Sequence, residues 1–507
     1  MPLCVDSALW LTDKSNPPNG FLLLAGWCFI DRKWSPTAFA DGSTSAVIDI
    51  VVTGPSGAES FLDLRTMETR EDVNTEYPGS PVHCGFQFVL PTSGMPIGRK
   101  VDFRIKHKGV QVADYSVGNI QDASDPGKLA DFLGIERPLI GKLENLLLNE
   151  QERLAQVIVK QSAPISLYID PSFGCNLKCP HCISENLRAK RFMRPVLKEE
   201  MLEHILSVFG ENIIKVTFAL WGEPLLNTKL EQYVRRMKDH HIYVEMSTNL
   251  SVPLSDARID HIMAAGFDAM RLSIDGATQE NYEKYRVGGS LDLALGNLRR
   301  MAEAKRRLGL SAPELGWQFL IWPWNEHEVD AARTLANENG ADSFRAFPGH
   351  PWKVDLQGRE RLPEDDAVPV KDQLARRAAD RRQDLRQNRH AVGCDFLDHT
   401  IAINSDGAIH PCCYVVEQKD TFGNVADCDR TNAFNLPPIL NLRRFVKGLS
   451  HDSRNGPSPC ANCDSLQSGH IPDQLGFFHA LAILRQIRTA PVRVKNLEIS
   501  VTGAHQP

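Results

Sequence analysis

The sequence lacks any long hydrophobic run, although 42% of its 507 residues are hydrophobic. Apolar stretches such as residues 21–25 and 477–484 are far shorter than the roughly 20 residues that a membrane-spanning helix needs. The N-terminus has no basic segment followed by an apolar one. We therefore predict no signal peptide and no membrane span, and we expect the protein in the cytoplasm.

An excess of positive charge is also missing, because 57 lysines and arginines face 63 acidic residues and the net charge is −6. Binding to nucleic acid phosphates needs clustered basic side chains that outweigh the acids nearby, so we expect no nucleic-acid partner. The one basic run, residues 371–390, alternates arginine with aspartate and glutamine at helical spacing. This pattern predicts a solvated helix face.

Disulfides are the third expected absence, even though the chain has 12 cysteines. Thiols stay reduced in the cytosol, so metal ligation explains the cysteines better. Three of them are scattered before residue 85, and three more lie together at 175–182. The other cysteines lie in the last quarter of the chain: Cys394, Cys412, Cys413, Cys428, Cys460 and Cys463.

The first part of the chain has the pattern of an antiparallel β-sandwich. Between residue 8 and about residue 120, short apolar segments with period-2 alternation are separated by Gly, Pro, Asn and Asp. We assign the sandwich to residues 1–122. Apolar residues at helical spacing then predict a helical linker over residues 123–164.

From Ser166 onward, strand patterns alternate with amphipathic helix patterns, including a long helical stretch over 279–308. The expected strands are 166–170, 215–220, 243–248, 269–275, 316–321 and 343–347. Six such repeats predict an α/β fold, a partial (β/α)6 barrel over residues 165–370 with functional residues at the C-terminal ends of its strands.

The rest of the chain is predicted to form a small cysteine-rich domain over residues 371–470. It contains a hairpin that turns at Asp406-Gly407. A C-terminal helix and tail, residues 471–507, complete the chain.

Just after the first barrel strand, Cys175, Cys179 and Cys182 follow the spacing C-x3-C-x2-C. Three thiolates on a [4Fe–4S] cube leave one iron open to a cofactor or substrate. The alternative is a zinc site completed by His181, because three cysteines and one histidine are a common zinc set.

This loop resembles that of the radical S-adenosylmethionine (SAM) superfamily, in which the open iron is chelated by the amino and carboxylate groups of SAM. Three further segments at expected strand ends resemble the family too: ALWGEPLLN, MSTNL and RLSIDG, followed by YEKYRVGG. The resemblance implies that the SAM-binding residues are His181 beside adenine, Gly222, Glu223, Pro224, Ser247, Asn249, Ser273, Asp275 and, at the SAM carboxylate, Arg286.

The resemblance also implies the reaction. An electron from the reduced cluster cleaves SAM to methionine and a 5′-deoxyadenosyl radical, which abstracts hydrogen from a substrate C–H bond. Such an enzyme needs an electron donor such as flavodoxin or ferredoxin. The protein orients the substrate and excludes water while the cofactors supply the chemistry.

The cysteines of the last quarter resemble the SPASM/Twitch extension of the same superfamily, which binds auxiliary clusters. The resemblance implies one auxiliary [4Fe–4S] cluster held by Cys394, Cys412, Cys460 and Cys463, with a structural zinc knuckle as the alternative. Either Cys412 or its neighbour Cys413 could serve as the ligand. Cys413 and Cys428 are also candidate catalytic thiols that return hydrogen to a product radical, although a spare cysteine is more often inert core.

Three functions compete at this point. In the N-terminal domain, Gly26-Trp27, residues 70–73, Tyr77-Pro78 and Gly85-Phe86 resemble a motif of a β-sandwich appended to bacterial glycosyltransferases. This resemblance favours a sugar or glycan substrate that is epimerised or oxidised. The second candidate is radical modification of a peptide or protein, and the third is a non-catalytic, zinc-stabilised adaptor. The aromatic segments at 322–328 and 347–352 are candidates for lining a substrate pocket.

Overall fold

The computed structural model describes residues 3–12, 20–28, 47–65, 85–92, 95–107, 110–118, 120–180, 182, 196–349, 394–413, 421–430, 432–447 and 476–489. The chain divides into two compact units. The first consists mainly of residues 1–157 together with 476–485, and the second contains most of the remainder.

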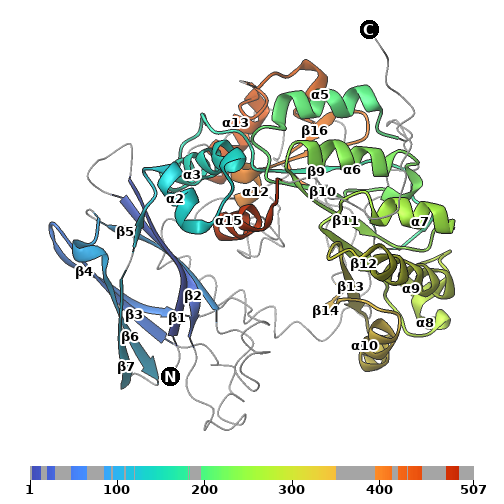
Figure 1. Ribbon diagram of the computed structural model, residues 1–507, viewed down its shortest axis with the longest axis horizontal. Coiled ribbons are helices and arrows are strands. Elements are labelled where there is room, and N and C mark those ends of the chain that lie inside the picture. Colours follow the sequence, from blue (N-terminus) through green and yellow to red (C-terminus); the bar gives the residue numbers. More distant parts are fainter. Residues whose placement is uncertain are drawn as a thin grey trace. The chain divides into compact units, whose positions relative to one another are not determined.

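The first unit is built on a β-sandwich (Figure 1). Within the described residues, its sheets have the strand orders β5-β2-β1-β8 and β4-β3-β6-β7, antiparallel except for the short β8. The strands are β1 (Leu3–Thr12), β2 (Gly20–Cys28), β3 (Val47–Gly54), β4 (Gly57–Arg65), β5 (Gly85–Thr92), β6 (Val101–His107), β7 (Val110–Val117) and β8 (Gln121–Asp122). Alternating apolar side chains, among them Leu22, Ile50 and Phe103, form the core between the sheets. The predicted sandwich is confirmed.

Two helices follow the sandwich, as the apolar spacing predicted. Helix α2 (Pro126–Leu133) begins after Asp125, whose side chain accepts a hydrogen bond from the backbone N–H of Lys128. It ends at Gly134, where φ is +68°. Helix α3 (Ile140–Leu154) comes next.

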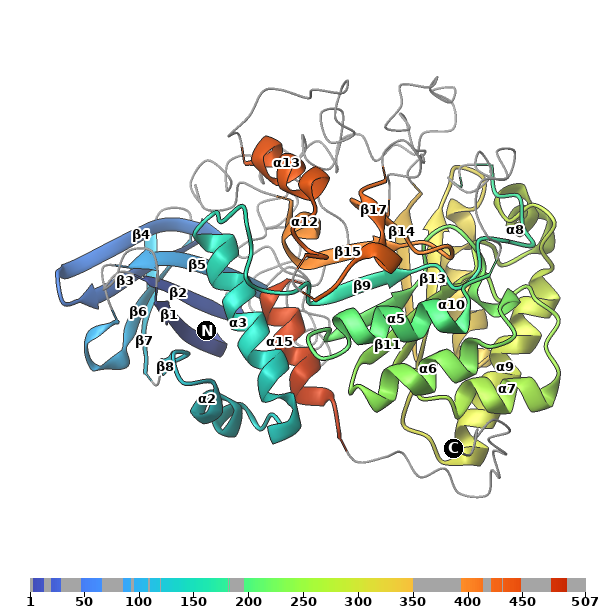
Figure 2. The ribbon, with the colours of Figure 1, turned by 90° about the horizontal axis from the view of Figure 1, so that it is seen from above.

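A helix from the far end of the chain belongs to the same unit. Helix α15 (Phe477–Gln486) lies beside α3 in both views (Figures 1 and 2). Its buried residues include Phe477, Leu481 and Leu484. The helix expected near the C-terminus therefore helps to form the N-terminal unit.

The second unit contains the predicted parallel half-barrel. Six parallel strands follow one another in chain order within a sheet that has nine strands among the described residues. They are β9 (Ser166–Ile169), β10 (Lys215–Phe218), β11 (Tyr243–Thr248), β12 (Ala269–Ser273), β13 (Glu314–Ile321) and β14 (Ser343–Pro348). All six lie where the sequence pattern placed them.

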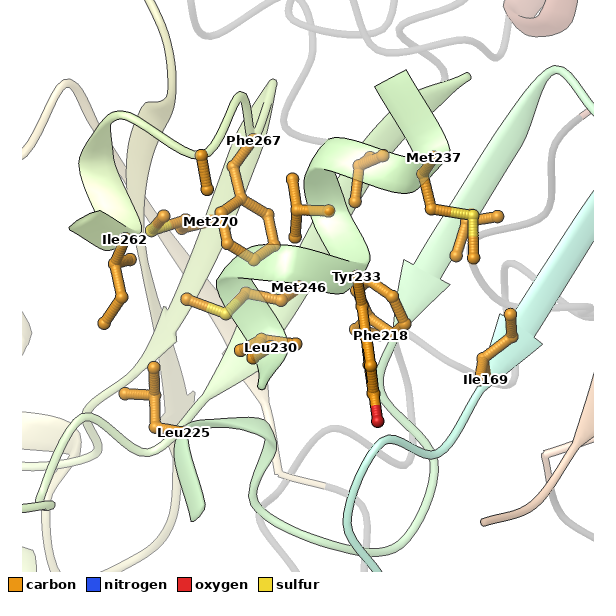
Figure 3. Close-up of a cluster of buried hydrophobic side chains, with 14 of the residues drawn as sticks. Ile169, Phe218, Leu225, Leu230, Tyr233, Met237, Met246, Ile262, Phe267 and Met270 are labelled. Carbon is orange, nitrogen blue, oxygen red and sulfur yellow. The ribbon is translucent and has the colours of Figure 1, made fainter. Parts of the chain in front are cut away.

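One face of this sheet packs against helices, and side-chain alternation decides which residues lie there (Figure 3). Phe218 of β10, Met246 of β11 and Met270 of β12 share an apolar core with Tyr233 and Met237. The covering helices are α5 (Glu199–Phe209), α6 (Leu230–Asp239), α7 (Asp256–Met263), α9 (Leu291–Leu308) and α10 (Val329–Glu338).

The side chains that alternate with these apolar ones along each strand lie on the other face of the sheet, which is polar. Glu245 of β11 accepts hydrogen bonds from the Thr217 hydroxyl (2.9 Å) and from Arg271, and it pairs with Lys215 (2.8 Å). Burial opposes ionisation of Glu245, but Arg271 and Lys215 together lower its pKa to about 2. The inner face of the half-barrel therefore carries charges that are already paired.

The long helical stretch expected over 279–308 is two helices, α8 (Gln279–Tyr285) and α9. Two glycines make the break. Gly288 has φ of +82°, and a Cβ on Gly289 would come within 2.9 Å of the Tyr282 hydroxyl. The left-handed backbone and the close contact both stop a continuous helix.

The cysteine-rich region is joined to the half-barrel by main-chain hydrogen bonds. Strand β15 (Thr400–Ile403) pairs in parallel with β9 (Figure 2), and β16 (Ala408–His410) and β17 (Gly423–Asn424) extend the sheet further. The predicted hairpin turn is present, and Gly407 in it has φ of +87°. Its addition to the barrel sheet was not predicted. Among the described residues, no helix is long and apolar enough to cross a bilayer.

Candidate functional site

The three clustered cysteines lie in the loop that leaves the C-terminal end of β9. The backbone N–H of Cys182 donates to the carbonyl of Cys179 (3.1 Å), which folds the loop back on itself. The N–H of Lys178 donates to the carbonyl of Val287 (3.0 Å), just after α8. A main-chain hydrogen bond therefore connects the cysteine loop to the segment that follows helix α8.

Polar side chains from the segments that follow β11 and α8 reach two of the sulfur atoms. Asn249 Nδ2 lies 3.8 Å from Cys175 Sγ, which also accepts from the N–H of Leu177 (3.4 Å). Arg286 Nη1 lies 3.8 Å from Cys179 Sγ. Burial raises the pKa of the Cys179 thiol, and the positive charge of Arg286 opposes this rise.

An apolar cluster surrounds the same thiols and contains Leu177, Tyr285 and Trp322. The rings of Tyr285 and Trp322 lie 4.8 Å apart, and Trp324 stacks on Trp322 at 5.5 Å. Trp322 and Trp324, from the aromatic segment that was a candidate for the substrate pocket, therefore pack beside the cysteine loop. Aromatic side chains in this place restrict the access of water to a metal centre.

Glu223 ties the segment after β10 to the segment after β11. Its carboxylate accepts from the Thr248 hydroxyl (2.5 Å) and from the N–H groups of Asn249 (2.8 Å) and Leu225 (3.1 Å). Burial raises the pKa of Glu223, and these hydrogen bonds oppose the rise. The side chain also caps the short 3-10 helix that starts at Pro224.

Gly222 sits where no other residue fits. A Cβ there would lie 1.3 Å from the carbonyl oxygen of Ser172, and its N–H donates to Asp170 Oδ1 (3.3 Å). The next residue, Glu223, donates its N–H to the carbonyl of Gly174 (2.8 Å). The predicted SAM-binding segment is therefore in direct contact with the chain that leads into the cysteine loop.

Ser247 and Ser273 lie at the ends of neighbouring strands, and their hydroxyl oxygens are 3.3 Å apart. Ser247 is partly buried and Ser273 is buried. The structure therefore brings these two predicted site residues together on the polar face of the sheet.

Asp275 and Arg286 bind each other. Arg286 Nε donates to Asp275 Oδ2 (2.6 Å), and the second oxygen accepts from the N–H of Leu320 (2.6 Å). Asn325, after β13, donates to the carbonyl of Asp275 (3.0 Å). The buried Asp275 carboxylate therefore binds both Arg286 and the backbone of β13, and it holds the arginine beside the cysteine loop.

The hairpin arranges the cysteines of the second predicted site. Cys394 precedes helix α12 (Asp395–His399), which leads into β15, and Cys412 and Cys413 follow β16. Because Ala402 pairs with His410 in antiparallel register, the two cysteine-bearing segments leave the hairpin at the same end.

Cys428 lies in the apolar core of the half-barrel unit with Val425 and Phe434. Its thiol donates to the carbonyl of Asn424 (3.4 Å), and burial raises its pKa. This is the setting of a structural cysteine. Its role as a hydrogen donor stays a prediction.

Several predicted features lie outside the described residues. They are His181, Cys460, Cys463, the basic helix at 371–390, residues 350–352 of the second aromatic segment, and residues 70–73 and 77–78 of the glycosyltransferase-like motif.

Two residues at the site were missed in the sequence. Asp170 is fully buried at the end of β9, burial raises its pKa to about 8, and its Oδ2 has no hydrogen-bond partner among the described residues. Trp221 donates its indole N–H to the carbonyl of Cys413 (3.1 Å). The strand-end rule that found the other residues also applies to Asp170. No local signal indicates a contact between residues 221 and 413.

The donors present fit an iron–sulfur cluster. Such clusters are held by thiolates and respond to hydrogen bonds at sulfur and to burial, and the loop offers three thiols with N–H donors in an apolar setting. Within the described part of the chain, no three His, Cys, Asp or Glu side chains lie close enough to hold a single metal ion. A four-iron cluster spreads its thiolates further apart than one zinc ion does.

The fold and the site define an iron–sulfur enzyme with its cluster loop at the C-terminal edge of a parallel half-barrel. Residues 169–311 match the model of the radical SAM superfamily, and residues 394–464 match the SPASM iron–sulfur cluster-binding domain. The chain therefore contains a radical SAM domain and a SPASM domain. The first domain binds a [4Fe–4S] cluster and SAM, and the second binds auxiliary iron–sulfur clusters. The predicted family, fold and cofactors are confirmed.

Curated relatives have different substrates. PqqA peptide cyclase of Gluconobacter oxydans is 23% identical over 322 residues, which are 60% of this chain and 83% of that protein. A probable GTP 3′,8-cyclase of Halobacterium salinarum is 26% identical, over 55% of this chain and 80% of that protein. Mycofactocin maturase MftC of Mycobacterium tuberculosis is 29% identical over 35% of this chain, and the match spans only 43% of MftC.

Solved structures resemble the chain at low identity. Streptococcus suis SuiB bound to S-adenosylmethionine covers 67% of this chain and 80% of its own, with 17% identity and a TM-score of 0.47. Native anSMEcpe with bound AdoMet and Kp18Cys peptide covers 61% and 88%, with 18% identity and a TM-score of 0.42.

Proposed function

We propose that this enzyme uses the 5′-deoxyadenosyl radical to modify a peptide or protein substrate. The observation that carries the proposal is the match to PqqA peptide cyclase, which extends over 83% of that relative and over 60% of this chain. A match of that length extends well beyond the 143 residues of the radical SAM domain.

Sequence reasoning favoured a sugar or glycan, on the basis of the N-terminal domain. Part of the motif behind that reading lies outside the described residues, and a β-sandwich by itself implies no substrate. The peptide reading is therefore the better supported of the two.

Each residue of the site has a proposed task. Cys175, Cys179 and Cys182 hold the cluster, which supplies the electron that cleaves SAM when both are bound. Arg286, held by Asp275, presents a cation beside the Cys179 sulfur and suits the SAM carboxylate.

Glu223 and the backbone around Gly222 shape the proposed site for the SAM amino group. The carboxylate holds the segments after β10 and β11 together, so those backbone groups are fixed before SAM binds. Trp322 and Trp324 keep water from the radical.

The first test measures 5′-deoxyadenosine formed from SAM by the anaerobically reconstituted, reduced protein. We expect the wild type to form it and Cys179→Ala to form none, because the cube then loses a protein ligand. Arg286→Lys is the matched variant that keeps the charge but not the planar fork, and we expect weaker SAM binding with the cluster retained. A Cys179→Ala protein as active as the wild type would remove the radical SAM mechanism.

The substrate test offers the enzyme synthetic peptides that are encoded beside its gene and, separately, UDP-glucose, both in deuterium oxide. Mass spectrometry of the products then separates the two readings. Loss of hydrogen, a new cross-link or deuterium uptake in a peptide supports the proposal. Substrate-dependent deoxyadenosine and a modified product only with UDP-glucose would contradict it.

A further inference from the structure

Two asparagine side chains and one backbone segment form a closed ring of hydrogen bonds beside the cysteine loop. Asn249 Nδ2 donates to Asn176 Oδ1 (3.0 Å), and Asn176 Nδ2 donates to the carbonyl of Ser251 (2.7 Å). The N–H of Ser251 donates back to Asn249 Oδ1 (2.8 Å). Because Asn176 directly follows Cys175, the ring connects the segment after β11 to the start of the cysteine loop.

The ring fixes the direction in which the Asn249 amide points. A backbone N–H can only donate and a backbone carbonyl can only accept, so Ser251 identifies the oxygen of Asn249 and the nitrogen of Asn176. Asn249 Nδ2 then has one hydrogen for Asn176 Oδ1 and one for Cys175 Sγ, which lies 3.8 Å away. Asn249 is only 5% exposed, and its backbone N–H donates to Glu223 (2.8 Å). The amide is therefore held with an N–H toward the sulfur.

The sulfur that receives this N–H belongs to the first cysteine of the loop. All three cysteines of the loop lie among the described residues, and they pack in one cluster with Leu177. The backbone N–H of Leu177 also donates to Cys175 Sγ (3.4 Å). Reduction adds negative charge to a cluster and its thiolates, so hydrogen bonds to sulfur stabilise the reduced state. Loss of the amide donor would make the cluster of the radical SAM domain, called the SAM cluster below, harder to reduce.

We propose that Asn249 is a positioning residue for the SAM cluster: its side-chain N–H holds the Cys175 thiolate and raises the cluster's reduction potential. The electron concerned is the one that the cluster takes from its donor and passes to SAM. Asn249 is thereby assigned to the cluster, whereas the resemblance assigned it to SAM. The proposal rests on the radical SAM domain and does not depend on the identity of the substrate.

The first test looks for the contact itself in the full-length protein. The side-chain amides of asparagine are labelled with the heavy isotope of nitrogen, and the protein is reconstituted anaerobically without SAM and reduced with dithionite. Pulsed electron paramagnetic resonance then measures coupling between the label and the reduced SAM cluster. The spectrum of the Cys175→Ala, Cys179→Ala, Cys182→Ala protein is subtracted to remove any auxiliary cluster. We expect a coupling in the wild type that Asn249→Leu loses, and a wild type without it would contradict the proposal.

The second test compares midpoint potentials by redox titration. Asn249→Leu keeps the approximate shape of the side chain and loses the donor. We expect the equilibrium constant for one-electron reduction of its SAM cluster to fall roughly three- to tenfold, the scale of one hydrogen bond, where tenfold is about 59 mV. Asn249→Asp keeps the acceptor for Ser251 but places a negative charge beside the sulfur, so its cluster should be at least as hard to reduce. Iron content and circular dichroism report loading and folding.

Asn176→Ala is the matched control. It opens the same ring at an exposed position and leaves the contact between Asn249 and Cys175. We expect this variant to keep both the wild-type midpoint and the coupling to the labelled amide. Equal shifts in Asn176→Ala and Asn249→Leu would mean that the potential follows the order of the loop, and that result would overturn the proposal.

SAM binding, measured by equilibrium dialysis, separates the two roles of Asn249. Weaker SAM binding by Asn249→Leu with a wild-type midpoint would make Asn249 a SAM ligand and would refute the proposal. A lowered midpoint measured without SAM supports it. If Asn249→Leu does not fold, a coupling that is present in the wild type and lost in Asn249→Asp supports the proposal, and a coupling retained in Asn249→Asp contradicts it. No peptide is present in these experiments, so their failure is distinct from failure of the peptide proposal.

Discussion

The carboxylate of Glu223 is bound entirely by groups of the chain itself. Both oxygens accept hydrogen bonds, and the donors come from its own segment and from the end of β11. A buried carboxylate with three donors cannot be exchanged for an amide without placing an N–H₂ group against another donor.

Glu223→Gln should therefore destabilise the protein by about 1–3 kcal/mol and weaken SAM binding. Thermal unfolding and equilibrium dialysis with labelled SAM measure the two effects. Thr248→Val, which removes one donor and leaves the carboxylate, is the milder matched change. A glutamine variant with the stability and the SAM affinity of the wild type would mean that the carboxylate does not hold the two segments together.

Asp170 leads to a pH-dependent prediction. Burial raises the pKa of Asp170 from 3.8 to about 8, so between these values the unfolded chain releases a proton that the folded chain keeps. The contribution of Asp170 to stability is therefore complete below about pH 4 and falls as the pH rises toward 8.

Asp170→Asn removes this dependence, so its unfolding temperature should fall less than that of the wild type between pH 5 and pH 8. Calorimetry at the two pH values measures the difference. Parallel declines in both proteins would show that Asp170 is ionised in the folded state.

At the scale of elements, the contact between the loop after β9 and the segment after β10 allows no side chain at Gly222. A Cβ there lies 1.3 Å from the backbone oxygen of Ser172, so Gly222→Ala must displace main chain. We expect SAM to bind at least tenfold more weakly, on the order of 1.4 kcal/mol or more.

Gly296→Ala, in helix α9, is the control for this prediction. A Cβ there meets nothing within 4 Å, so alanine should raise helix stability by roughly 0.5–1 kcal/mol and leave SAM binding unchanged. The same dialysis and thermal unfolding serve both variants. Normal SAM binding by Gly222→Ala would disprove the tight contact.

At the scale of the whole molecule, most of helix α15, residues 477–485, belongs to the same compact unit as residues 1–157. Leu484 is fully buried in it, and Gln486 is exposed. Leu484→Ala should cost about 2–5 kcal/mol and reduce the protection of α3 amides against hydrogen exchange. Gln486→Ala should leave that protection unchanged. Unaltered exchange in both variants would mean that α15 does not support α3.

Much of the fold followed from local pattern. Period-2 and helical spacing located all six parallel strands. This worked because the residues of each strand that face the covering helices are apolar, and that pattern is local. The break at Gly288–Gly289 was missed, since the helical spacing continues on both sides of it. The addition of β15 to β9 was missed as well, because backbone hydrogen bonds between strands leave little trace in side-chain type.

The sequence by itself determined the chemistry of this protein. Three closely spaced cysteines and the motifs at successive strand ends are local features, and parallel strands bring their C-terminal ends to one edge. The tertiary structure alone decided how these groups are connected. The pairing of Asp275 with Arg286 is one case, and the bond from Trp221 to Cys413 across 192 residues is another. Such contacts depend on where the chain folds back, and no spacing in the sequence encodes that.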